Sequence, residues 1–94
     1  MEEPASSFQK RVTICNVKGL HARASAKFAT KALEFRAVVT VTKEGTTVNA
    51  TSIMGLLLLA AQMGQSITIS AQGPDAAAAL AALVQLVEAK FDEK

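Results

Sequence analysis

The residues with the clearest chemical potential lie in the segment Gly19–Ser25, GLHARAS, which contains the only histidine of the chain, His21. A flexible glycine precedes the imidazole, Arg23 follows it, and an alanine-rich stretch typical of a helix comes next. This order places the ring at a helix amino-terminus, where free backbone N–H groups and the helix dipole favour an anion. The local chemistry therefore indicates a histidine that accepts and holds a phosphoryl group.

A histidine nucleophile needs a neutral ring with an exposed lone pair. A free imidazole is mostly neutral near pH 7, and a helix amino-terminus further disfavours positive charge on the ring. After phosphorylation, the same N–H groups can donate hydrogen bonds to the phosphoryl oxygens. Arg23 adds a permanent cation whose planar fork suits phosphate.

Other uses of these residues are less well supported. One histidine and one cysteine, Cys15, without clustered carboxylates nearby do not make an ordinary zinc site. The nearest acid in sequence, Glu34, stands at the far end of the expected helix, so no serine-histidine-acid set is indicated. A Cys15–His21 nucleophilic pair is a minor alternative, because Cys15 is expected to pack as a small hydrophobic residue. A helix cap or surface residue without chemistry stays open as a second interpretation of His21.

Length and composition point to one small globular domain without a cofactor. The chain has 94 residues, half of them hydrophobic, and its only aromatic residues are four phenylalanines. Alanine, valine and leucine must therefore fill the core. The one cysteine excludes an intramolecular disulfide. The acidic, polar start shows no signal peptide, and the apolar run Ile53–Ala61 is far shorter than the ~20 residues of a membrane helix, so we expect a cytoplasmic protein without membrane insertion.

The basic residues are concentrated in the half of the chain that contains His21. The net charge is only +2, but eight of the ten basic residues fall between positions 10 and 43. A positive field there speeds encounter with acidic partners or anionic groups, whereas the alternative is an ordinary solvated face. These eight residues are Lys10, Arg11, Lys18, Arg23, Lys27, Lys31, Arg36 and Lys43.

Hydrophobic periodicity and turn residues predict the elements that must position the histidine. The expected strands are Phe8–Val17, Ala37–Lys43, Thr46–Asn49 and Ser66–Ala71; the expected helices are Ala22–Leu33, Ser52–Ala61 and Ala76–Phe91. The order β-α-β-β-α-β-α predicts an α/β (α+β) two-layer sandwich, with a four-stranded antiparallel sheet and the helices on one face. Residues 1–7 are expected to form a flexible tail and residues 8–94 a single domain.

The first helix is expected to present an apolar stripe and a basic one on different faces. The apolar stripe comprises Ala22, Ala26, Ala29 and Leu33, joined by Phe28 and Ala32. Arg23, Lys27 and Lys31 recur every four residues and are expected to be solvated.

Two segments resemble the HPr family, the histidine-containing phosphocarriers of the bacterial phosphoenolpyruvate-dependent phosphotransferase system. Gly19–Arg23 resembles the active-site signature, and Asn49–Leu56, NATSIMGL, is similar to the regulatory-serine segment. The two segments have the order and separation of the family, and the resemblance extends from Phe8 to Phe91. It implies the open-faced HPr sandwich of four antiparallel strands and three helices.

The resemblance also implies a role for the histidine segment. His21 would take a phosphoryl group on Nδ1 from enzyme I, which is charged by phosphoenolpyruvate, and pass it to a IIA-type acceptor. Arg23 would steady the phosphoryl group, and the N–H groups of Ala22 and Arg23 would contact it. Such a protein is a stoichiometric carrier and not an enzyme.

The second segment implies regulation and docking. Ser52 would be phosphorylated by HPr kinase/phosphorylase, and Ile53, Met54 and Leu57 would form an apolar patch that docks on enzyme I and the acceptors. Without the resemblance, Ser52 is interpreted as the cap of the short helix. The apolar residues could instead complete the core, although the run of four leucines from position 56 cannot be buried entirely on a short helix.

The sequence departs from the family pattern at one position, and two alternative functions stay open. The family usually has proline where this chain has Ala24, which adds a free N–H and loosens the helix start. A nitrogen-related regulatory phosphorelay is the alternative to the sugar-transport branch. A nucleic-acid-binding module is a remote alternative, because Phe8 is the only aromatic residue in an expected strand.

Overall fold

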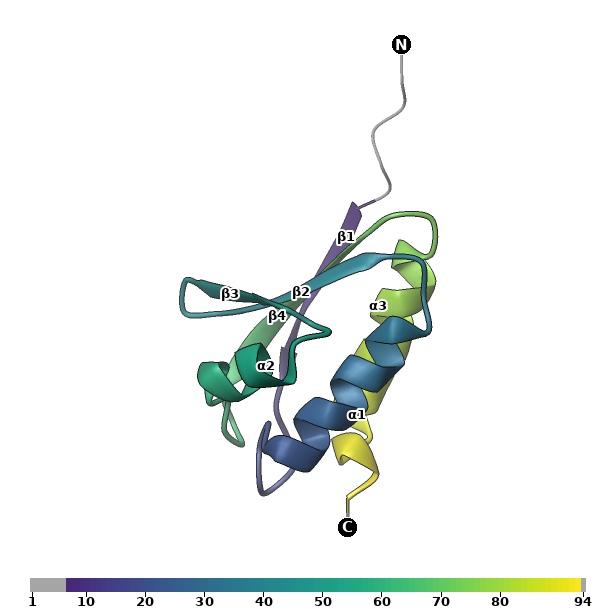
Figure 1. Cartoon of the computed structure of the whole chain (residues 1–94). Helices are drawn as coiled ribbons and strands as arrows, with labels where there is room; N and C mark the ends of the chain where they lie inside the picture. Colours follow the sequence, from purple (N-terminus) through teal and green to yellow (C-terminus); the bar gives the residue numbers. More distant parts are fainter. Residues whose placement is uncertain (1–6, 94) are drawn as a thin grey trace.

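One four-stranded sheet supports the rest of the fold in the computed structural model, which describes residues 7–93 (Figure 1). The strands lie in the order β1-β4-β2-β3, and every neighbouring pair is antiparallel. Threonine, valine and isoleucine dominate them, as expected for strands with one half-exposed face. Their bounds are β1 Ser7–Thr13, β2 Val38–Lys43, β3 Thr46–Asn49 and β4 Ser66–Gln72.

Three helices cover one face of this sheet and leave the other face open (Figure 1). They are α1 (Ala22–Leu33), α2 (Ile53–Leu59) and α3 (Ala76–Glu88), and a 3₁₀ turn, η1 (Lys90–Asp92), follows α3. The element order and the open-faced sandwich predicted from the sequence are confirmed. None of the helices within residues 7–93 combines the length and apolar character that a membrane crossing requires.

The core lies between the sheet and the helices. Along β4, Ile67, Ile69 and Ala71 are buried, and the residues between them are partly exposed. This alternation of two residues turns one face of the strand toward the helices. Leu83 and Val87 of α3 are buried as well, so small and medium aliphatic side chains fill most of the interior.

The buried face of α1 differs from the predicted stripe. Leu33 is 69% exposed and Ala22 is also exposed, so the prediction was wrong at both ends of the helix. The buried face includes Ala24 and Ser25 because α1 packs against both α2 and α3. Its buried residues are Ala24, Ser25, Phe28, Ala29 and Ala32.

Strand β1 begins earlier and ends earlier than predicted. Ser7, which was assigned to the tail, pairs with Gln72 in the sheet, and residues 1–6 of that tail lie outside the described residues. The strand stops at Thr13 instead of Val17. The chain then turns into the loop before α1, which leaves the side chain of Val17 79% exposed.

The last helix is shorter than predicted, because it ends at Glu88 and not at Phe91. Lys90, Phe91 and Asp92 then adopt left-handed backbone angles, with φ of 58°, 55° and 61°. Such angles cost about 1–2 kcal/mol per non-glycine residue, so other contacts must hold the turn. Phe91 is fully buried there, and the turn directs the end of the chain toward the start of α1 (Figure 1).

Gly19 meets two conditions that only glycine satisfies easily. Its φ is +66°, and an added Cβ would lie 2.5 Å from the carbonyl oxygen of Ala61 and 3.0 Å from the Cα of Gln62. Both neighbours are backbone atoms, so they cannot move aside as a flexible side chain would. The loop before α1 therefore lies directly against the segment that follows α2.

We expect Gly19→Ala to lower the free energy of unfolding by about 2–5 kcal/mol, combining left-handed strain with the steric clash. Gly45→Ala is the matched control, because Gly45 also has positive φ, +83°, but an added Cβ meets nothing within 4 Å. The control should lose only about 1–2 kcal/mol. Urea unfolding of both variants measures the difference, and equal losses would show that the close approach at Ala61 contributes nothing.

Candidate functional site

The loop between β1 and α1 is held by hydrogen bonds at its carboxyl end. Leu20 donates its N–H to the carbonyl of Ala61 (2.8 Å), and Ser25 donates its hydroxyl to the carbonyl of Leu20 (3.1 Å). The side chain of Leu20 is buried in the core. The residue that follows, His21, is therefore fixed in position relative to both α1 and the end of α2.

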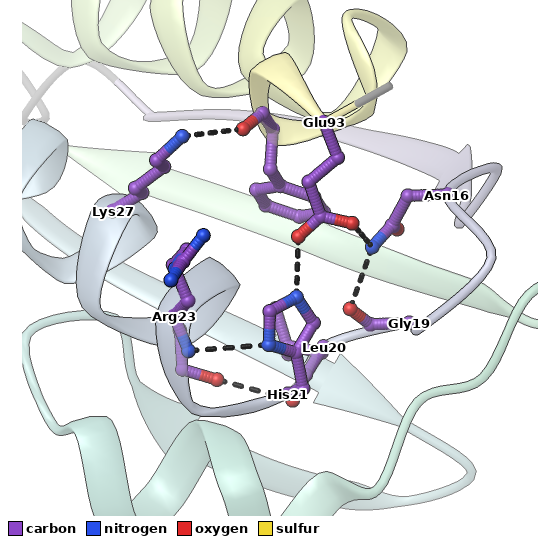
Figure 2. A network of polar contacts seen from close by, with 9 residues as sticks. Asn16, Gly19, Leu20, His21, Arg23, Lys27 and Glu93 are labelled. Atoms are coloured by element: carbon purple, nitrogen blue, oxygen red, sulfur yellow. Dashed lines mark hydrogen bonds and ion pairs between the residues drawn. The ribbon is translucent and has the colours of Figure 1, made fainter.

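His21 is the N-cap residue of α1, as the sequence predicted. Its backbone is extended, its carbonyl accepts the N–H of Ser25 (2.8 Å), and its Nδ1 accepts the N–H of Arg23 (3.3 Å) (Figure 2). No acidic residue occupies the first turn of α1, so the positive end of the helix dipole is not neutralised there. The side chain is 26% exposed, and the ring therefore stays within reach of another molecule.

A carboxylate from the other end of the chain lies against the ring. The Nε2 of His21 contacts Oε2 of Glu93, and Oε1 of Glu93 accepts a hydrogen bond from Nδ2 of Asn16 (3.0 Å) (Figure 2). Asn16 Nδ2 also donates to the carbonyl of Gly19 (2.8 Å). Glu34 is the nearest acid in the sequence, but in the folded chain it is Glu93, 72 residues away from His21, that contacts the ring.

The pKa of Glu93 lies below its ordinary value. The hydrogen bond from Asn16 contributes most to this, followed by the one from His21, and the charge of Lys18 lowers the pKa further. Glu93 is therefore a carboxylate at neutral pH. Because its pKa is lower in the folded chain, this contact stabilises the fold at neutral pH. That stabilisation is lost as the pH falls through the lowered pKa.

The ring opens onto a shallow pocket of about 770 Å³ at the amino-terminus of α1. Three cationic side chains and two acidic ones line it, and Arg23 is exposed at its edge. Such a surface can receive an anionic group while the acids limit the net positive charge. The lining residues are Val17, Lys18, His21, Ala22, Arg23, Lys27, Asp92 and Glu93.

The predicted solvated basic face is only partly confirmed. Lys27 is half-buried and donates from Nζ to the carbonyl of Phe91 (2.8 Å), so it also fastens the C-terminal turn (Figure 2). Lys31 forms an ion pair with Glu34 on its own helix (3.4 Å). Of the three residues, Arg23 is the one whose charge is most available to a bound anion.

Cys15 does not pair with His21. Its half-buried thiol donates toward the carbonyl of Val87 on α3 (3.4 Å), and both ring nitrogens of His21 have other partners. Within residues 7–93, no group of three histidine, cysteine, aspartate or glutamate side chains is arranged to hold a metal ion.

The second segment singled out by the sequence starts α2. Ser52 is its N-cap residue, and its Oγ accepts the N–H of Gly55 (2.9 Å). Thus the predicted capping role of Ser52 is confirmed. Ser52 is half-buried, so part of the residue stays accessible to solvent.

The apolar residues of α2 divide into a buried and an exposed set. Leu56 and Leu59 are buried, whereas Ile53 is 42% and Met54 69% exposed. Leu57, placed in the docking patch by resemblance, is only half-buried. Sequence reasoning missed the exposed side chain of Leu58, which lies four residues after Met54 and therefore on the same face.

Around the His21 ring, sequence reasoning missed Asn16 and Glu93. Asn16 carries a weak signal, since it is a polar residue inside the otherwise apolar stretch that follows β1. Glu93 carries none, because 72 residues separate it from His21 and the left-handed turn that brings it back has no glycine.

Comparisons with known proteins agree with this geometry. The family model "PTS HPr component phosphorylation site" matches residues 8–89. The phosphocarrier protein NPr of Shewanella violacea is 48% identical over 88 residues, covering 94% of this chain and 97% of its own. The phosphocarrier protein HPr of Cupriavidus necator is 44% identical over 85 residues, covering 90% and 96%.

Solved structures show the same fold. HPr of Thermoanaerobacter tengcongensis matches with a TM-score of 0.89 and 40% identity over 93% of this chain and 98% of its own. HPr of Bacillus anthracis matches with a TM-score of 0.84 and 45% identity over 87% and 98%. The histidine at the start of α1, the open-faced sandwich and these matches together show that the chain belongs to the HPr family of phosphotransferase-system components.

Proposed function

We propose that this chain is a phosphocarrier, which accepts a phosphoryl group on Nδ1 of His21 and passes it to another protein. The observation that carries the proposal is the position of Nδ1. It accepts a backbone N–H at the amino-terminus of α1 and therefore presents a lone pair there, beside an open pocket with Arg23 at its edge. Relatives named as phosphocarrier proteins support this carrier role over a nucleic-acid-binding one.

The transfer step follows from this arrangement. The Nδ1 lone pair attacks the phosphorus of the donor, a P–N bond forms, and the electron pair of the breaking bond returns to the donor. Nδ1 then no longer accepts the N–H of Arg23, which becomes free to bond a phosphoryl oxygen together with the N–H of Ala22. The guanidinium of Arg23 steadies the same group. Onward transfer reverses these events.

The partners follow from the family. The donor is enzyme I, charged by phosphoenolpyruvate, and the acceptors are IIA-type proteins in the cytoplasm. The relatives include both an NPr, at 48% identity, and an HPr, at 44%. Acceptors of the sugar-transport branch and of the nitrogen-related branch both belong in the transfer assay, and the faster acceptor identifies the branch.

Incubation with enzyme I and phosphoenolpyruvate labelled on phosphorus should label the chain, and His21→Ala should reduce the label to background. The bound label should be lost in acid and kept in base, as a phosphorus–nitrogen bond requires. Cys15→Ser is the control and should be labelled normally, because its thiol lies against α3. Label that persists in His21→Ala, or that survives acid, would contradict the proposal.

Regulation at Ser52 is a further part of the proposal. Its hydroxyl stands at the start of α2, next to the exposed side chains of Ile53 and Met54. A phosphate there adds about −1.5 to −2 of charge and would oppose the docking of an acidic partner.

HPr kinase/phosphorylase with ATP should therefore label Ser52, as phosphopeptide mapping would show, and slow the uptake of phosphoryl groups from enzyme I. Ser52→Ala should lose this label and about 1 kcal/mol of stability, because Gly55 loses its cap. Thr51→Ala should keep the label. Label confined to residues other than Ser52 would reject this regulation.

Partner docking is proposed for the exposed face of α2, formed by Ile53, Met54 and Leu57 with Leu58 added by the structure. The exposed apolar side chains of α2, a helix that packs against α1 and its basic residues, suit a transient interface with an acidic partner.

We expect Met54→Glu to raise the apparent KM for enzyme I about tenfold, which corresponds to ~1.4 kcal/mol of binding. The unfolding free energy should stay within about 0.5 kcal/mol, because the side chain lies on the surface. Leu33→Glu is the matched control, since Leu33 is equally exposed, at 69%, at the other end of α1. Equal KM values for the two variants would remove Met54 from the interface.

A further inference from the structure

Glu93 is the one partner of the His21 ring that lies outside the 8–89 range matched by the family model. The family match therefore assigns no role to it. Among residues 7–93, its carboxylate is nevertheless one of two groups that bond the ring directly, and its side chain is only 18% exposed. A contact of this kind at the reacting residue calls for a physical account.

Each of the two groups bonded to the ring can act in only one way, one as a hydrogen-bond donor and the other as an acceptor. The backbone N–H of Arg23 can only donate, so Nδ1 of His21 must present a lone pair to it. The carboxylate of Glu93 can only accept at neutral pH, so Nε2 must carry the proton. These two contacts therefore select the neutral tautomer that carries its proton on Nε2.

Asn16 fixes the carboxylate in turn. Both contacts of its Nδ2 are to acceptors, the carbonyl of Gly19 and Oε1 of Glu93, so the orientation of the amide is determined. The side chain is 1% exposed, and its Oδ1 has no hydrogen-bond partner among residues 7–93. Burying an unpaired amide oxygen costs free energy, so the donors of Asn16 must offset that cost.

The turn that brings Glu93 to the His21 ring is strained in its backbone. The left-handed residues Lys90 to Asp92 reverse the chain after α3, and burial of Phe91 and the bond from Lys27 to its carbonyl hold the turn. Figure 2 shows the outcome, with the carboxylate of Glu93 standing between Asn16 and the ring.

We propose that Glu93, held by Asn16, is a positioning residue for His21: its carboxylate keeps the proton on Nε2 and so presents Nδ1 as the atom that takes the phosphoryl group. This inference rests on the proposed function. When the P–N bond forms at Nδ1, electron density leaves the ring and Nε2 keeps its proton, so the ring becomes positive. The carboxylate across from it then faces a cation and stabilises the phosphorylated state.

The first test is the ring proton of the unphosphorylated chain, followed by NMR of the ¹⁵N-labelled protein. In the wild type, the proton on Nε2 should be slow to exchange with water. In Glu93→Ala it should exchange at least about tenfold faster, because the bond that protects it is gone. Glu93→Gln keeps a neutral acceptor and should fall between the two.

The second test separates the charge of Glu93 from its structural contacts. Glu93→Gln removes the charge and keeps one acceptor oxygen for Nε2 of His21, but its NH₂ group cannot accept the bond from Nδ2 of Asn16. Asn16→Ala loses that same bond and keeps the charge, so a merely structural role predicts equal transfer rates in the two variants. The proposal predicts instead that the single-turnover transfer rate at saturating enzyme I is about tenfold lower in Glu93→Gln than in Asn16→Ala, with the apparent affinity unchanged. Glu88→Gln removes the same charge from an exposed position of α3 and should leave both values unchanged.

Two outcomes would overturn the proposal. One is a ring proton that exchanges as fast in the wild type as in Glu93→Ala, and the other is a transfer rate in Glu93→Gln that equals the rate in Asn16→Ala. Failure of the proposed function is recognised separately. In that case the wild type and all Glu93 variants stay unlabelled, whatever the exchange rate of the ring proton. The inference about Nδ1 is then rejected together with the proposed function.

Discussion

The contact between the loop before α1 and the segment after α2 is the constraint on which the site depends. At Gly19 the two backbones lie closer than any side chain allows, and the Leu20–Ala61 hydrogen bond joins them one residue later. His21 follows directly, so its place at the start of α1 is set by backbone atoms on both sides. A site built this way keeps its geometry without a large core beneath it, which matters in a chain of only 94 residues.

Local patterns in the sequence predicted much of this molecule because the features concerned are local. The start of α1 at Ala22, the hairpin of β2 and β3, and the cap of α2 at Ser52 all follow from residues within a few positions of each other. The element order then restricts the topology to an antiparallel sheet with helices on one face. The errors at the ends of β1 and α3 have another origin, since there the tertiary contacts of the loop and of Phe91 override the periodicity.

The site itself was predictable only on one side of the ring. The glycine, the histidine and the arginine are neighbours in sequence, and the helix they introduce supplies the N–H group that bonds Nδ1. The other side is formed by Asn16 and Glu93, which meet only because three successive residues take left-handed angles. No propensity favours that turn in a sequence without glycine there, so nothing local could have predicted the acid beside the ring.

These two sides give the imidazole opposite electrostatic surroundings at its two nitrogens. Nδ1 faces the positive end of α1 and Nε2 faces a carboxylate. A phosphoryl anion on Nδ1 would meet the helix end and Arg23, while the positive charge that develops on the ring would meet Glu93. Each charge of the phosphorylated state therefore lies toward its opposite. A carrier must hold its phosphoryl group and still release it. Stronger stabilisation of the phosphorylated state by Glu93 and the helix amino-terminus would retain the group, and weaker stabilisation would prevent its uptake.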